Sequence, residues 1–170
     1  QSKGTWSQIA VLTGDDAGAL DLFGWTVSVS GATAVVGAFQ DDDGAFGAGS
    51  AYVFREVNSR WTQIAKLNAL DAAQGDAFGF TVSISGDTAV IGAPNDDDGG
   101  LTSGSAYLFR EVAGVWTQIA KLIAADTSED DSFGRSVAIS GATAIIGAVE
   151  DDANGIDESG SAYIFRDIGG

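Results

Sequence analysis

Short runs in which apolar and polar residues alternate recur along the chain, and loops rich in Gly and Asp separate them. In residues 80–85, Val82 and Ile84 alternate with Thr and Ser, the period of two expected of a strand with one buried face. Residues 88–93 are apolar on both faces, which predicts a strand inside a sheet that is covered on both sides. The Gly-Asp pair at 86–87 predicts a two-residue hairpin between these strands.

Two further runs complete a unit of four strands: residues 61–67, which begin with a Trp, and residues 103–110. The unit is written three times, because its landmark residues recur at a spacing of 55. These landmarks are Trp6, Trp61 and Trp116, the Phe-Gly pairs at 23–24, 78–79 and 133–134, and the Gly-Ala pairs at 37–38, 92–93 and 147–148.

The repeat divides the chain into three units, residues 1–60, 61–115 and 116–170, which form one continuous array. Four short antiparallel strands in each unit predict an all-β fold of three four-stranded propeller blades, open or completed by another chain. A β-helix is the structural alternative, although its rungs are usually shorter than this period. Helical periodicity is absent, and the Gly, Thr, Ser and Val content disfavours helices.

The composition narrows the possible functions. The 170 residues carry a formal net charge of −16, so nucleic acid and anionic membranes are not expected partners. The chain contains no Cys, His or Met, which removes the thiolate nucleophile, the disulfide framework and the commonest general base. No apolar run is long enough for membrane insertion. With no Gly-x-Ser-x-Gly motif or phosphate-binding loop, the sequence predicts a protein without catalytic activity.

The second unit carries the clearest family resemblance. Phe78-Gly79, followed by the run from Val82 to Gly92-Ala93-Pro94, resembles the FG-GAP repeat, and the other units match it except that Phe39 and Val149 replace the proline. The resemblance implies the β-propeller of integrin α chains and of bacterial extracellular proteins, and hence an extracellular or cell-surface location. The integrin calcium loop does not carry over, because the hairpin at 85–88 is short and poor in carboxylates.

Acidic clusters follow each Gly-Ala pair and are the candidate calcium ligands. Calcium takes six to eight oxygen ligands, and Asp-rich loops supply them. Solvated turns are the alternative interpretation, because Asp is a common turn residue and no stretch has the spacing of a known calcium loop. The candidate ligands are Asp41, Asp42, Asp43, Asp96, Asp97, Asp98, Asp151 and Asp152. Asp repeats with the unit, whereas a catalytic carboxylate pair would break the repeat.

The order of strands predicts two unfinished ends. If the Phe-Gly strand is innermost, the Trp strand is the outermost strand of the preceding blade, so Trp6, Ile9 and Leu12 lie on a donor strand without a blade. Tyr163 and Phe165 then lie on the acceptor edge of a blade that lacks its outer strand. Unpaired edges recruit strands from elsewhere. Two copies would close a six-bladed ring, a longer chain would supply further blades, and head-to-tail addition would give a filament.

Two functions are compatible with these features. The first is an extracellular structural module that assembles through its chain-end strands, with copies of itself or further blades as partners. The second is a calcium-dependent, adhesin-type propeller that binds a protein or a glycan. Trp25, Phe80 and Arg135 occupy the same place in the three units, and their different chemistry disfavours a repeated sugar pocket.

Overall fold

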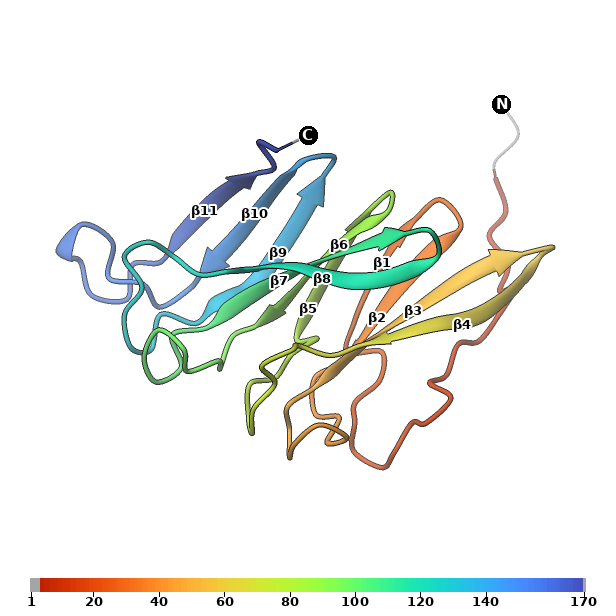
Figure 1. Cartoon of the computed structure of the whole chain (residues 1–170), viewed down its shortest axis with the longest axis horizontal. Helices are drawn as coiled ribbons and strands as arrows, with labels where there is room; N and C mark the ends of the chain where they lie inside the picture. Colours follow the sequence, from red (N-terminus) through yellow and green to blue (C-terminus); the bar gives the residue numbers. More distant parts are fainter. Residues whose placement is uncertain (1–3, 170) are drawn as a thin grey trace.

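The computed structural model describes residues 4–169, which form three antiparallel sheets that stand side by side in chain order (Figure 1). The first sheet contains β1 (Thr26–Ser30), β2 (Thr33–Ala38), β3 (Ser50–Val57) and β4 (Arg60–Leu67). The second contains β5 (Thr81–Ser85), β6 (Thr88–Ala93), β7 (Ser105–Val112) and β8 (Val115–Leu122). The third contains β9 (Phe133–Ser140), β10 (Thr143–Ala148) and β11 (Ser161–Arg166), with a short 3-10 helix, η1 (Ala153–Gly155), before β11.

The strand predictions for the second unit are confirmed, with shifts of one or two residues at the ends. β5 and β6 pair from Thr81↔Gly92 to Ser85↔Thr88, which leaves the predicted two-residue turn between them. All six residues of β6 are buried, as expected for a strand covered on both faces. The all-β blade architecture is therefore confirmed.

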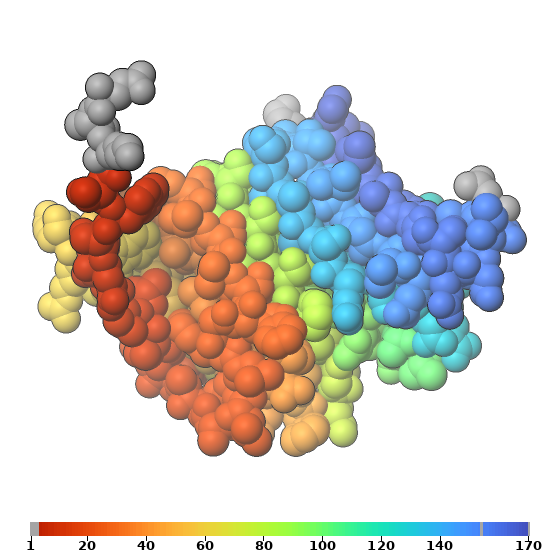
Figure 2. Space-filling view, turned by 180° about the vertical axis from the view of Figure 1, so that it is seen from behind, coloured from red at the N-terminus to blue at the C-terminus, as the bar shows by residue number. Residues whose placement is uncertain are grey.

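The phase of the blades also follows the prediction. The Trp strands β4 and β8 are the outermost strands of the first and second sheets, so each sheet crosses the boundary between two sequence units. The third sheet has three strands within the described residues, because nothing there pairs with the outer edge of β11. Residues 6–12, the predicted donor segment, form no strand and lie along the outside of the first sheet (Figure 2).

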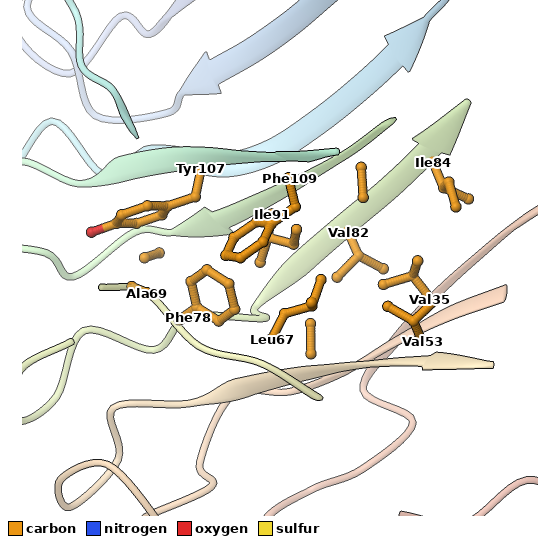
Figure 3. Packing of buried hydrophobic residues seen from close by; sticks show 13 residues of the cluster. Val35, Val53, Leu67, Ala69, Phe78, Val82, Ile84, Ile91, Tyr107 and Phe109 are labelled. Atoms are coloured by element: carbon orange, nitrogen blue, oxygen red, sulfur yellow. The ribbon is translucent and has the colours of Figure 1, made fainter. Parts of the chain in front are cut away.

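Most of the core lies between neighbouring sheets. Val35 and Val53 of the first sheet meet Val82 and Ile84 of the second, and Phe78 is fully buried in the same cluster (Figure 3). A second cluster joins the second and third sheets in the same way. A third, smaller cluster belongs to the first sheet alone, where Phe23 and Leu12 pack against the buried Tyr52 and Phe54. Because the two larger clusters form only where two sheets meet, each blade depends on a neighbour for much of its stability.

Close backbone contact explains why the Gly of the Gly-Ala pair is repeated. A Cβ atom built on Gly92 would collide with the carbonyl oxygen of Gly134, which lies at the start of the third sheet. Gly37 meets Gly79 in the same way at the first junction. Any larger residue at these places would force neighbouring inner strands apart.

The two outer flanks of the stack are partly bare. Val27 and Val29 on β1 are 69% and 65% exposed, whereas the corresponding Val82 and Ile84 on β5 are each 6% exposed. At the other flank Ile164 on β11 is 69% exposed. These strand positions are thus buried at an inner junction and exposed at the ends, whereas Tyr52 and Phe54 stay buried against Phe23. The exposed positions indicate a repeat that fits neighbours on both sides.

Candidate functional site

A lysine-centred socket joins the outer strand of the second sheet to two acidic loops. Lys121 on β8 lies opposite Tyr107 on β7, and its ammonium nitrogen is surrounded by three carboxylates. The Nζ–Oδ2 distances are 2.8 Å to Asp71, 2.9 Å to Asp96 and 2.6 Å to Asp98. The Tyr107 hydroxyl donates a 2.6 Å hydrogen bond to the buried Asp96 carboxylate. Four segments that are distant in sequence therefore meet at one cation.

The first sheet repeats this socket with corresponding residues. Lys66 lies opposite Tyr52, and its Nζ is 2.8 Å from Asp16, 2.9 Å from Asp41 and 2.5 Å from Asp43. The Tyr52 hydroxyl donates to Asp41 at 2.7 Å. Because the whole arrangement recurs, we regard the socket as a regular structural element of the blade rather than a chance surface ion pair.

The loop backbone fixes the central carboxylate. Asp96 lies three residues after the end of β6, and its Oδ1 accepts a hydrogen bond from the backbone N–H of Asp98 at 3.1 Å. Its backbone oxygen accepts from the N–H of Gly104 at the far end of the same loop. Backbone hydrogen bonds from two places in the loop thus hold the Asp96 carboxylate next to the lysine of β8.

The electrostatics of the socket stabilise charged acid and charged base together. Burial by itself raises the pKa of Asp96, but the hydrogen bonds from Tyr107 and Lys121 outweigh it and hold that pKa below its usual range. Burial disfavours the ammonium of Lys121, yet its three carboxylate partners raise the lysine pKa above its ordinary value. The pKa of Tyr107 is raised by burial and by Asp96. The socket therefore holds an ion pair at neutral pH.

The structure places six of the eight predicted calcium ligands in two groups. Asp41, Asp43, Asp96 and Asp98 point into the two lysine sockets. Asp97 and Asp152 instead bind their own loops, where they accept backbone hydrogen bonds from Thr102 and Glu158 at 2.9 and 2.8 Å. Asp42 is exposed, and Asp151 is buried in the third unit.

Only one group of carboxylates in the described residues has the geometry for a metal ion. Asp71, Asp96 and Asp98 place one oxygen each within 4.8 Å of one another. The ammonium of Lys121 already lies among these oxygens, so a divalent ion would have to displace it. Calcium at the acidic loops remains a prediction.

Sequence reasoning missed the lysines. Lys66 and Lys121 are 55 residues apart and stand in identical Gln-Ile-Ala-Lys-Leu runs, in a chain with only eight Lys and Arg residues. The lysines repeat at the same spacing as the Asp residues, and this shared spacing was the signal in the sequence that could have paired them. Asp16 and Asp71 also repeat at this spacing, but the sequence alone did not show that their loop would reach the lysine.

The third sheet carries the acidic half of a socket without its lysine. Asp126, Asp151 and Tyr163 correspond to Asp71, Asp96 and Tyr107. Asp151 is buried, and no Lys or Arg within residues 4–169 forms an ion pair with it or with Asp126.

Groups near Asp151 have raised pKa values, as their counterparts Asp76 and Tyr107 do in the second unit. Burial, together with repulsion from Asp151 and Asp126, raises the pKa of Asp131. Burial and the nearby Asp126 carboxylate raise the pKa of Tyr163. What distinguishes the third unit is that Asp126 and Asp151 have no cationic partner within residues 4–169.

A cavity of about 440 Å³ lies between the second and third sheets, next to the end of β11 at Arg166. Leu108, Leu122, Ile139 and Phe165 contribute its apolar walls. The corresponding residues one junction earlier, Val53, Leu67, Ile84 and Phe109, belong to the cluster against which Trp116 of β8 packs. The cavity is thus the place that the Trp of a fourth strand would fill.

A row of aromatic rings forms a second feature at the start of the inner strands. Trp25 lies 4.9 Å from Phe39 and 5.8 Å from Phe80 between ring centroids. The guanidinium of Arg135 lies 4.7 Å from the Phe80 centroid, within cation–π range. The positions that differ among the three units therefore come together in space, with Trp25 half exposed.

Small antiparallel sheets stacked through their inner strands define the class of proteins built from β-propeller blades. The FG-GAP repeat model matches residues 6–54, 61–109 and 116–165, and these three segments make up most of the sequence. The chain belongs to the FG-GAP repeat family, which confirms the resemblance found in the sequence. No curated protein matches it with significance. Within the described residues no helix has the length and apolarity needed to cross a bilayer.

Proposed function

We propose that the chain is a non-catalytic, extracellular structural module that assembles through its chain-end strands. The open edge of β11 accepts a fourth strand, and the segment with Trp6, Ile9 and Leu12 is available as a donor. Copies of the chain or further blades of a longer chain are the partners, and the product is a ring or a filament. The observation that carries this proposal is the cavity beside β11, which corresponds to the place where the partly buried Trp116 packs one junction earlier.

Exposure at the edge supports strand addition. Tyr52 and Tyr107 are fully buried under their outer strands, whereas Tyr163 is only half buried and Ala162 is exposed. Trp6 is fully exposed on the unpaired N-terminal segment. A fourth strand would bury all of these side chains and pair the free edge of β11, and both changes favour association.

The flanks offer matching surfaces for a neighbouring blade. Between successive blades, Arg55 pairs with Glu111 at 2.7 Å, and Arg110 pairs with Asp167 at 2.9 Å. Arg166 and Glu56 are the corresponding residues at the two ends, and neither forms an ion pair within residues 4–169. The basic end of one stack and the acidic end of the next are thus complementary.

Sedimentation velocity over a range of concentrations tests assembly. We expect the purified chain to form larger species as its concentration rises, and Trp6→Ala to shift this equilibrium toward monomer without changing the melting temperature. Leu70→Ala is the matched control, because it removes a strongly exposed apolar side chain, 84% accessible, that belongs to neither chain-end strand. Negative-stain images separate rings from filaments. A chain that stays monomeric at every concentration would contradict assembly through its own end strands.

The second candidate function is a calcium-dependent adhesin that binds a protein or a glycan. The exposed Trp25 within the aromatic row favours it, because sugars and peptides stack on such rings. A polysaccharide ligand would quench Trp fluorescence in the parent chain and not in Trp25→Ala. For calcium, a melting curve with and without a chelator decides: a bound ion raises the midpoint, and an unchanged midpoint excludes it.

A further inference from the structure

We propose that the strand completing the third sheet carries a lysine opposite Tyr163, so that its natural occupant is the outer strand of another FG-GAP blade rather than the N-terminal segment of a second copy. This inference rests on the proposed addition of a strand to β11. It goes further by naming the chemistry that selects the partner.

The two complete sheets define what the occupant must present. In each, the lysine is paired in register with the tyrosine of the neighbouring strand, as Tyr52↔Lys66 and Tyr107↔Lys121. Each ammonium contacts an almost fully buried Asp at 2.9 Å. On β11 the corresponding tyrosine is Tyr163. An added strand in the same register therefore brings the residue five positions after its Trp to the half-socket.

The half-socket needs a cation from outside. Asp151 is 6% exposed and has no cationic partner in the described chain, unlike Asp41 and Asp96. Asp126 adds a second carboxylate to the same place, and the position of Asp98 is taken by Ala153. Bringing an apolar strand over two carboxylates would desolvate them without compensation, whereas an ammonium supplies both with a partner.

The chain's own donor segment fails at this one position. Residues 6–12 read Trp-Ser-Gln-Ile-Ala-Val-Leu, against Trp-Thr-Gln-Ile-Ala-Lys-Leu at 61–67 and 116–122. Val11 therefore stands where Lys66 and Lys121 stand. The Trp and the Gln are kept, so the segment fits the cavity and the edge but brings no charge to the half-socket.

The two kinds of strand share their Trp and Gln, so only the lysine can discriminate between them as occupants of the β11 edge. Gln118 accepts a 3.0 Å hydrogen bond from the backbone N–H of Leu70, and Gln63 accepts one from Asp15 at the same distance. Ala125 is the corresponding residue of the third unit, and either type of strand would offer it a Gln. Either type would also fill the cavity with a Trp. Selectivity between the two strands thus depends on Lys against Val.

Two eight-residue peptides test the proposal on the full chain. One has the sequence of residues 115–122, VWTQIAKL, and the other, VWTQIAVL, differs only by Lys→Val at the position of Lys121. We expect the lysine peptide to bind about 10- to 100-fold more tightly in a titration followed by calorimetry, because a charge-assisted bond to a buried carboxylate is gained. Asp151→Asn should abolish the preference, and Asp157→Asn, in the same loop but exposed, should keep it.

The outcomes separate the two proposals. Equal affinity of the peptides overturns the lysine inference and leaves strand addition standing. Binding of neither peptide overturns strand addition at β11, and the inference with it. A preference that survives in Asp151→Asn also refutes the half-socket as its cause.

A variant of the intact chain gives an independent measurement. Val11 is exposed on the unpaired segment, so Val11→Lys is not expected to disturb the fold. If the lysine is what the third sheet selects, this substitution strengthens self-association by a similar factor, and Val11→Gln, which adds polarity without charge, does not. Unchanged association of Val11→Lys relative to Val11→Gln would overturn the inference.

Discussion

Lys121→Met should destabilise the protein through one buried carboxylate. The substitution keeps the length and the apolar stem of the side chain but removes the ammonium from among Asp71, Asp96 and Asp98. Asp96 is the partner that matters, because its side chain is 4% exposed, whereas those of Asp71 and Asp98 are 38% and 66% exposed.

The magnitude follows from these exposures. Each exposed pair contributes about 0–1 kcal/mol, since water and salt screen it. A buried carboxylate left without its cation costs about 3–5 kcal/mol. Tyr107 and the backbone N–H of Asp98 continue to donate to Asp96, so we expect a loss of about 3 kcal/mol in the free energy of unfolding, toward the lower end of that range. For a chain of this size, that lowers the melting temperature by roughly 6–12 °C.

Calorimetric or circular-dichroism melting at pH 7 measures the effect. Arg60→Met is the matched control, because it removes the same charge from an exposed site of an outer strand and should change stability by less than about 0.5 kcal/mol. Adding Asp96→Asn to Lys121→Met should recover most of the loss, because a neutral amide needs no cation. Destabilisation of Lys121→Met no larger than that of Arg60→Met would refute the buried ion pair as a source of stability.

Three further outcomes are expected. Lys66 and Lys121 have raised pKa values in the folded chain, so the unfolded chain loses these protons first as the pH rises. The melting temperature should therefore be steady below about pH 10.5 and fall above it, and a flat profile to pH 12 would contradict the sockets. Asp131→Asn should stabilise the chain by up to about 1 kcal/mol at pH 7, because burial and nearby carboxylates raise the folded pKa of Asp131. The gain should vanish as the pH falls below about 3.8, where the unfolded carboxyl is also neutral, and a gain that persists in acid would point to another cause. Gly92→Ala should cost about 3 kcal/mol or prevent folding, because its Cβ would collide with the next blade, whereas Gly44→Ala, with its nearest atoms at 3.9 Å, should melt like the parent; similar melting of the two variants would contradict the close contact.

Much of the fold could be predicted because its rules are local. The alternation of Val82 and Ile84 with polar residues specifies a strand with one buried face, and the Gly-Asp pair at 86–87 specifies the hairpin. The order of the landmarks also specified that the Trp strand closes the preceding sheet, and hence the open edge at β11. Each of these inferences needs only a few neighbouring residues, and the three copies supported one another.

The candidate site could be predicted only in part. The recurrence of Asp41, Asp96 and Asp151 marked the correct loops, but the interpretation as calcium ligands did not include the lysine that occupies two of the three places. Lys66 and Asp16 are 50 residues apart, and no local rule states that two such residues will meet. The cavity beside β11 was also beyond sequence reasoning, because its walls come from two different sheets.

The sequence by itself determined the number of units, the strands, the turns and the phase that leaves an edge unpaired, since strand periodicity and turn chemistry act over a few residues. Only the tertiary structure decided that Lys121 neutralises Asp96, that Asp151 lacks such a partner, and that Val27 and Ile164 are left bare. Burial and charge pairing depend on which segments become neighbours in space. The same side chain is therefore core at an inner junction of the stack and open surface at its end.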